Sequence, residues 1–178
     1  DRFESRGLGD VYKRQLDVYR IATNSTKTIT TQGFSLGLNY YLDSKYTFNG
    51  NFSWNKLNKQ IDDPIIPAYN TPEFKFNVGL SGKDISIELN EKSLIKDIGF
   101  SFNYKWVQGF LFEGSPQFTG KVPTYGLLDL QITKNMKKQN LAIKIGASNI
   151  LNNRVLQVYG GPFIGRMAYI SLLFDFKD

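Results

Sequence analysis

The residues best suited to hold a small ligand are four aromatics in segments without regular periodicity: Tyr69, Phe118, Tyr159 and Phe163. Aromatic faces at such positions stack well on a sugar or on an aromatic ligand. The same side chains suit a second role, because aromatic residues also anchor loops at a membrane surface. Both uses stay open from the sequence.

Catalytic and metal chemistry have little support in this chain. It contains no cysteine and no histidine, which removes thiolate nucleophiles, disulfides, the usual general base and the usual zinc ligand. Asp62 and Asp63 are adjacent, but two carboxylates fall short of a Ca²⁺ ligand set, so we expect a solvated loop there. The run Gly160-Gly161-Pro162 lacks the lysine of a phosphate-binding loop and predicts a tight turn. We therefore expect no enzyme, no cofactor and no metal.

The formal net charge of +6 raises the question of a nucleic-acid partner. Lysine and arginine are scattered, without a block of five or six, which is typical of a mildly basic surface. We expect no nucleic-acid partner. A nucleic-acid-binding β-barrel would instead be retained on heparin, with a steep dependence on salt.

The first fifteen residues differ from the rest of the chain. Residues 5–15 have neither helical nor strand periodicity, and they resemble a translated sequencing-library adapter. We interpret 1–15 as a non-native segment and 16–178 as one structural unit, with the natural sequence cut upstream. A basic N-terminal arm is the alternative.

The elements that would position any site are β-strands, because apolar residues recur with a period of two from Leu16 onward. The alternation predicts an all-β antiparallel meander of seven long strands, with a weaker eighth around 16–22. The seven predicted strands are 34–42, 46–54, 74–80, 98–106, 128–132, 141–147 and 170–176.

Strand length and connection length both carry information. Phe110 and Phe112 keep the phase of 98–106, so one strand over 98–112 is expected, and a membrane-crossing strand needs about 9–11 residues. Residues 82–97 should be a long connection on the side of the short turns, with room for one helical turn in 89–98. The other predicted connections alternate between short turns (43–45, 134–140) and long loops (55–72, 114–122, 149–165).

The two faces of the predicted strands differ in a way that favours a membrane. One face is apolar and uncharged, and the other holds small and amide side chains. Such an amide-rich face suits a hydrated lumen, whereas a soluble sheet would expose many charged residues. Glycine, serine and asparagine fill too little volume for a small closed barrel, so a wide one is expected. The aromatics expected near the membrane interfaces are Tyr40, Tyr46, Trp54, Tyr104 and Trp106.

Three segments carry a resemblance to a known family. Residues 70–82 (Asn-Thr-Pro-Glu-Phe onward), 146–153 (Gly-Ala-Ser-Asn-Ile-Leu-Asn-Asn) and 165–172 resemble stretches near the end of TonB-dependent outer-membrane receptors. The ending Ile170, Leu172, Phe174 and Phe176 is similar to the signal by which barrel-assembly machinery recognises outer-membrane strands. Lys177 and Asp178 follow it, whereas the family ends at or just after the aromatic residue.

The resemblance spans residues 16–178 and implies a fold, a location and partners. It implies the C-terminal part of a 22-strand transmembrane β-barrel in the outer membrane of a Gram-negative bacterium, surrounded by outer-membrane lipid. Family members take up a siderophore, vitamin, glycan or peptide with energy from the TonB–ExbB–ExbD complex, through a plug domain that this chain does not contain. The alternative is a soluble β-sandwich or barrel that binds carbohydrate or lipid.

Overall fold

The computed structural model describes residues 30–58, 69–90, 93–114 and 118–176, and most of them lie in β-strands. Seven strands form one antiparallel sheet whose strand order follows the chain, and each of the seven predicted strands overlaps one of them. The predicted meander is therefore confirmed. The strands are β1 (Thr30–Tyr41), β2 (Tyr46–Asn58), β3 (Phe74–Asn90), β4 (Ser93–Val107), β7 (Tyr125–Met136), β8 (Leu141–Ser148) and β11 (Met167–Phe174).

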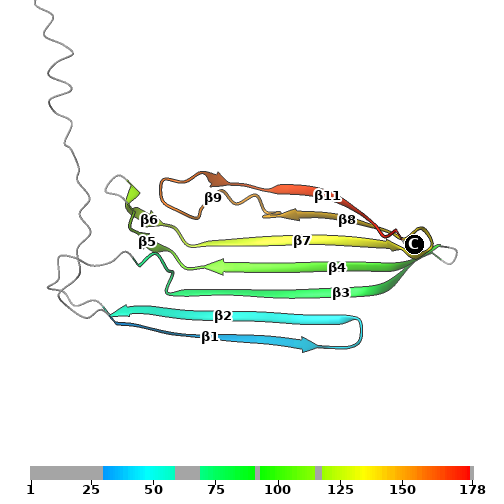
Figure 1. Cartoon of the computed structure of the whole chain (residues 1–178), viewed down its shortest axis with the longest axis horizontal. Helices are drawn as coiled ribbons and strands as arrows, with labels where there is room; N and C mark the ends of the chain where they lie inside the picture. The colour runs from blue at the N-terminus through cyan, green and yellow to red at the C-terminus, as the bar shows by residue number, and fades with distance from the viewer. Residues whose placement is uncertain (1–29, 59–68, 91–92, 115–117, 177–178) are drawn as a thin grey trace, which may run out of the picture.

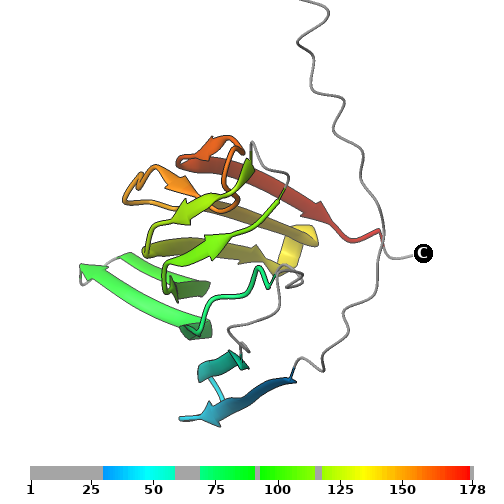
Figure 2. The same ribbon diagram turned by 90° about the vertical axis from the view of Figure 1, so that its left-hand side faces the viewer.

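The sheet is curved and open (Figures 1 and 2). β1 and β11 are its two edges, and no closed barrel forms within the described residues. The proposed eighth strand around 16–22 and the proposed boundary after residue 15 lie outside the described residues. No helix in the described part of the chain is long and apolar enough to span a bilayer.

The register places the predicted apolar residues of all seven strands on one face. Residues directly opposite each other in an antiparallel pair project to the same side. Leu36, Phe52 and Phe76 align in this way across β1, β2 and β3. At the other end of the sheet, Ile145 of β8 aligns with Ile170 of β11. We call this surface the apolar face and its opposite the polar face.

The apolar face is uncovered. Leu36 is 64% exposed, and Leu172 at the far edge is 68% exposed. The buried hydrophobic residues in the described part of the chain are Val107, Val122 and Val155, all near one end of the sheet. The structure therefore buries very little of the large apolar surface that its strands create.

Aromatic residues mark both ends of the apolar band. Trp54 packs against Phe34 with ring centroids 5.8 Å apart, and Trp106 stacks on Phe76 at 5.4 Å. Tyr46 lies at the opposite end of β2 from Trp54. At roughly 3.3 Å per residue, the eight steps between them span about 26 Å along the strand. The nine residues from Tyr46 to Trp54 agree with the about 9–11 residues that a tilted membrane-crossing strand requires.

The two ends of the sheet are built differently. At one end, called the turn end, the connections are residues 42–45, 91–92 and 137–140, the last including the 3-10 turn η2 (Lys137–Gln139). At the other, called the loop end, the connections are long and carry two small hairpins. These are β5 (Phe110–Phe112) with β6 (Gly120–Val122), and β9 (Val155–Leu156) with β10 (Phe163–Ile164).

The expected long connection over 82–97 is wrong, as is the possible helical turn in 89–98. β3 continues to Asn90 and β4 begins at Ser93, so the two strands form an extended hairpin. Register shifts between Gly82 and Asn90 interrupt the alternation of the sequence, because each bulge moves the side chains to the other phase. The connections at the turn end are thus all short.

The expected continuous strand over 98–112 is also wrong. β4 ends at Val107, and β5 leaves the main sheet to pair with β6. The break lies at Gly109, whose N–H donates to the Thr124 hydroxyl at 2.8 Å. A Cβ at this position would lie 2.8 Å from the Val122 carbonyl oxygen, so only glycine lets the two segments approach this closely.

Candidate functional site

The loop end holds the small core of the structure and the surface most suited to a ligand. Val122 is fully buried, and Val107 and Val155 are each 4% exposed. Two aromatic rings fasten the loops to each other. Tyr159 covers Gly120, and Phe118 covers Gly160, so that a Cβ at either glycine would overlap the ring. The hairpins β5–β6 and β9–β10 are therefore interlocked.

An asparagine network fixes the connection that follows β8. Asn149 is 3% exposed and has a left-handed backbone, with φ of 50°. Its N–H donates to Asp129 Oδ1 at 2.8 Å. Its amide nitrogen donates to the Asn153 carbonyl at 2.7 Å, and its Oδ1 accepts from the Asn153 N–H at 3.0 Å. The backbone of this loop is thus held by side chains.

The neighbouring asparagines extend this network. Asn153 donates to the Gly126 carbonyl at 3.0 Å, and Asn152 accepts from the Arg166 N–H at 3.0 Å. Asn152 also has a left-handed backbone, with φ of 55°. Asparagine is one of the few residues that tolerates this conformation and supplies both donor and acceptor. The cluster Asn149, Asn152 and Asn153 signals such a turn, although the sequence does not specify its hydrogen bonds.

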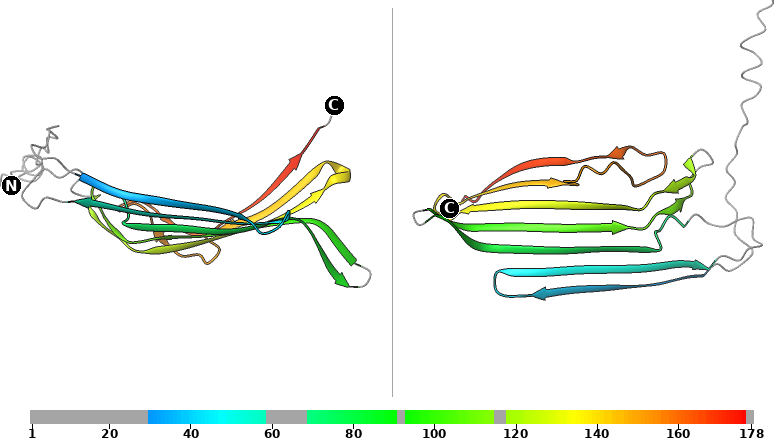
Figure 3. Two further views of the ribbon diagram at one scale, coloured as in Figure 1. Left: turned by 90° about the horizontal axis from the view of Figure 1, so that it is seen from below. Right: turned by 180° about the vertical axis from the view of Figure 1, so that it is seen from behind.

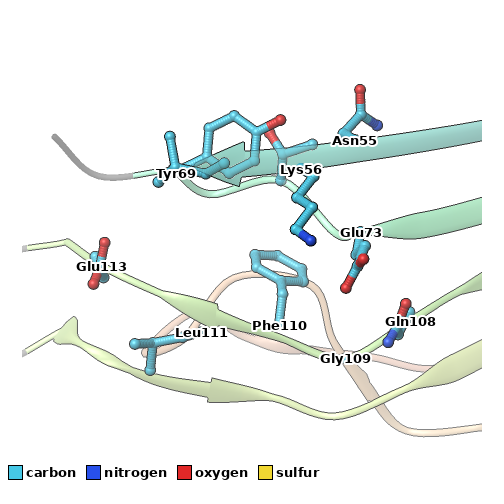
Figure 4. A pocket seen from close by; sticks show the side chains of 11 residues that line it. Asn55, Lys56, Tyr69, Glu73, Gln108, Gly109, Phe110, Leu111 and Glu113 are labelled. Carbon is cyan, nitrogen blue, oxygen red and sulfur yellow. The ribbon is translucent and has the colours of Figure 1, made fainter. Parts of the chain in front are cut away.

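A cleft of about 330 Å³ opens at the loop end between β2, the segment before β3, and β5 (Figure 4). The Lys56 side chain reaches across it toward Phe110 and Glu73. Asn70 ties the segment before β3 to the segment after β5 through reciprocal hydrogen bonds with the Glu113 backbone, at 2.7 and 3.0 Å. The remaining lining includes Asn55, Leu57, Tyr69, Thr71, Gln108 and Leu111.

The cleft has the chemistry of a site for a polar ligand with hydroxyl or amide groups. Tyr69 and Phe110 offer aromatic surface, and Glu73 and Lys56 offer an acceptor and a donor. Gln108 Oε1 is buried and has no hydrogen-bond partner in the described structure. An unsatisfied buried acceptor favours a ligand that supplies a donor to it.

The four aromatics predicted as ligand contacts do not form one site. Tyr69 lines the cleft. Phe118 and Tyr159 lie in the interlocked loops, each against a glycine. Phe163 on β10 is 68% exposed. Their role in ligand binding stays a prediction. The sequence did not single out Gln108 or Phe110, because they sit in what looked like a continuous strand.

The other predicted site residues can also be placed. Ile170, Leu172 and Phe174 project from β11, and Phe176 follows the strand with its ring 4.8 Å from that of Phe174. The turn expected at Gly160 is confirmed by the hydrogen bond from the Gly161 N–H to the Val158 carbonyl, at 3.0 Å. Asp62 and Asp63 lie outside the described residues. Elsewhere in the described ranges no cluster of acidic side chains could hold a metal ion.

The polar face carries small side chains and a few charges. A hollow of about 390 Å³ lies over Thr47, Ser101 and Gln131, and another of about 260 Å³ lies over Asn49 and Asn77. These hollows identify the polar face as the concave side of the curved sheet. Asp129 on this face binds the Asn149 backbone, and no ion pair joins it to a lysine within the described part of the chain.

Comparison of the chain with protein-family models, with curated proteins and with solved structures gives no match. The assignment of a function therefore depends on the residues and on the geometry described above.

Proposed function

We propose that this chain is the C-terminal part of the barrel of a TonB-dependent outer-membrane receptor in a Gram-negative bacterium. The receptor would take up a siderophore, vitamin, glycan or peptide. The observation that carries the proposal is the apolar face, which is continuous across seven strands and uncovered. An exposed apolar surface of this extent marks an interaction site or a membrane contact.

Lipid is the environment that best accounts for this face. Mid-strand side chains such as Leu38 on β1 and Ile145 on β8 are more than half exposed. Their burial in hydrocarbon would contribute roughly 25 cal/mol for each square ångström of apolar surface removed from water. The flanking aromatics Trp54, Trp106 and Tyr46 are at the places where membrane barrels carry aromatic girdles.

The open edges support a wide barrel. In lipid, each unpaired backbone group at the edge of a sheet costs several kcal/mol. β1 and β11 would therefore pair with further strands, and the 22-strand barrel of the family satisfies this need. The concave polar face, with Asn51, Asn77 and Asn103, would line a hydrated lumen and face the plug domain.

The difference between the two ends supports an orientation. Membrane barrels have short turns on the periplasmic side and longer loops outside. The loop end would then face the medium, where the cleft beside Tyr69 and Phe110 would contact the nutrient. The turn end would face the periplasm, where TonB of the TonB–ExbB–ExbD complex would act on the plug. The β11 residues would be the signal read by the barrel-assembly machinery.

The test is the dependence of the folded chain on detergent. We expect the full chain, refolded from denaturant, to stay in solution and to be rich in β-structure in detergent micelles, where its open edges can pair with those of other copies. Without detergent it should aggregate, as measured by light scattering and circular dichroism. A chain that is folded and monodisperse in plain buffer would contradict the proposal and support the soluble carbohydrate- or lipid-binding alternative.

A further inference from the structure

The extended β3–β4 hairpin projects beyond the other strands at the turn end. The regular pairing of β3 with β4 stops at Gly82 and Phe100, in the same row as Tyr46, the first residue of β2. Residues 83–98 continue past this row, and we call them the arm. β3 has 17 residues and β4 has 15, more than the about 9–11 of a membrane-crossing strand, so their extension into the arm needs another explanation.

Two acidic residues bend the arm, and one lysine holds it. Asp84 and Asp97 have left-handed backbones, with φ of 51° and 57°, and each lies at a register shift between β3 and β4. Lys137 in η2 binds both carboxylates, at 3.4 Å for Asp84 and 2.6 Å for Asp97. Lys134 donates to the Lys96 carbonyl. The neighbouring hairpin thus fixes the base of the arm.

The apolar face of the sheet continues along the arm. Ile85 pairs with Ile98, and Ile87 pairs with Ile95, so the four side chains share one side. Ile85 packs over Gly82 beside Phe100, which belongs to the apolar face. Ile87 is 46% exposed and Ile95 is 37% exposed. The bulges therefore bend the hairpin without turning its isoleucines to the polar side.

The direction of the bend decides what the isoleucines face. Figure 2 and the left view of Figure 3 show the arm leaving the sheet toward its convex side, away from the end of β11. The polar hollows occupy the concave side, so the arm bends toward the apolar face. A strand that bends toward its own apolar face turns that face back along the sheet. In a membrane, this direction points toward the lipid.

We propose that the arm lies on the periplasmic surface of the outer membrane, with Ile85, Ile87 and Ile95 inserted at the boundary between headgroups and acyl chains. This inference rests on the proposed membrane-spanning function. Lys96 is exposed next to Ile95 and suits contact with a lipid phosphate. Lys137 is ion-paired with both Asp84 and Asp97, and Lys134 is a second cation close to Asp97, so two lysines offset the two carboxylates at the base of the arm.

The absence of cysteine from the chain allows a direct test. Single substitutions Ile87→Cys, Ser86→Cys and Leu38→Cys each receive an environment-sensitive fluorophore. Ser86 is the matched control, because it is exposed on the arm next to Ile87. Leu38 reports the middle of the apolar face. The full chain is refolded into vesicles of phosphatidylethanolamine and phosphatidylglycerol that contain lipids with a nitroxide quencher in the headgroup or deep in the acyl chain.

We expect the label at 87 to be quenched several-fold more by the headgroup nitroxide than the label at 86, with emission shifted to shorter wavelength. The label at 38 should be quenched by the deep nitroxide. If 38 responds in this way while 87 and 86 are quenched alike, the arm proposal is overturned and the membrane assignment stands. A shift at 87 without quenching by lipid would mean that protein covers the arm, which also overturns the proposal. If 38 is not quenched, both proposals fail.

Discussion

At the scale of single residues, the glycine at position 146 determines how the last two strands of the sheet pack. Gln131, Gly146 and Tyr169 align in one row across β7, β8 and β11. The Tyr169 ring crosses the glycine, and its hydroxyl donates to Gln131 Oε1 at 2.8 Å. A Cβ at Gly146 would lie 2.5 Å from the ring. The side chain of Tyr169 thus depends on the empty space over Gly146.

Gly146→Ala should therefore destabilise the sheet, whereas Gly37→Ala should not. Alanine at 146 displaces Tyr169, and overpacking of this kind costs about 1–3 kcal/mol. A Cβ at Gly37 has its nearest neighbour at 3.9 Å, which is ordinary contact. The measurement is the free energy of unfolding in denaturant, in detergent micelles. Equal effects of the two substitutions would show that Tyr169 does not need the space.

Asn149 provides a second prediction, which distinguishes the contribution of its side-chain hydrogen bonds to stability from that of its left-handed backbone. Asn149→Gly removes the two hydrogen bonds with Asn153 and the one from its amide nitrogen to the Ile164 carbonyl, but keeps the left-handed backbone accessible, at a cost of about 1–3 kcal/mol for the groups left unsatisfied. Asn149→Ala loses the same bonds and adds roughly 1 kcal/mol of backbone strain. Proteolysis of the loop over 149–166 should accelerate more for alanine than for glycine. The reverse order would exclude a contribution from the backbone.

The sequence predicted the residues of the loop end better than their arrangement. Tyr69 does line a cleft, but Phe118 and Tyr159 are committed to packing on glycines, which periodicity does not reveal. The partners of Asn149 come from positions four, fifteen and twenty residues away. Contacts of this kind join residues that are distant in the chain. The local pattern of a single sequence therefore does not predict them.

At the scale of elements, the alternation of apolar residues located the strands but not their ends. A period of two holds where every residue is paired, as in β1 and β2. In the arm, the extra residues at Asp84 and Asp97 shift the phase, so the sequence looked like a long connection. At Gly109 the reverse happens: the alternation of apolar residues continues but the strand ends. Phe110 keeps the phase of β4 and yet belongs to a different sheet.

The ion pairs of Lys137 predict how the arm depends on pH. The hydrogen bond from Lys137 holds the pKa of the Asp97 carboxyl below its ordinary value of 3.8, and the same bond raises the pKa of Lys137 above 10.5. A lowered carboxyl pKa gives stability that is present above pH 3.8 and is lost as the pH falls through the folded value. A raised lysine pKa gives stability that is lost only as the pH rises beyond 10.5.

Lys137→Met should therefore loosen the arm at neutral pH, and acidification of the wild type through the Asp97 pKa should do the same. The readout is hydrogen exchange of the arm amides at matched intrinsic rates, which should be faster in both cases. Lys138→Met is the control, because Lys138 lies in the same turn without an ion pair to any described residue. If Lys138→Met loosened the arm as much as Lys137→Met, loss of general positive charge would explain the effect.

At the scale of the whole molecule, the question is what contacts the apolar face. Water and lipid predict different responses to a charge placed there. In water, an arginine on an exposed strand position changes stability little, wherever along the strand it lies. In a bilayer, the cost for a barrel is about 2–4 kcal/mol at the midplane and falls to about 0–1 kcal/mol near the interface. The dependence on depth therefore identifies the solvent.

β1 and the turn that follows it offer two matched positions for this test. Leu38 lies opposite Gly50, midway between Tyr46 and Trp54 of β2, and is 56% exposed, and Leu42 lies in the turn beside Tyr46 and is 58% exposed. In lipid vesicles, Leu38→Arg should lower the free energy of unfolding by about 2–4 kcal/mol and Leu42→Arg by about 0–1 kcal/mol. The two side chains are almost equally exposed in the sheet. A difference between the effects of the two substitutions on the free energy of unfolding would therefore come from the surrounding bilayer. Equal and small effects would place the face in water, and the receptor assignment would then fail.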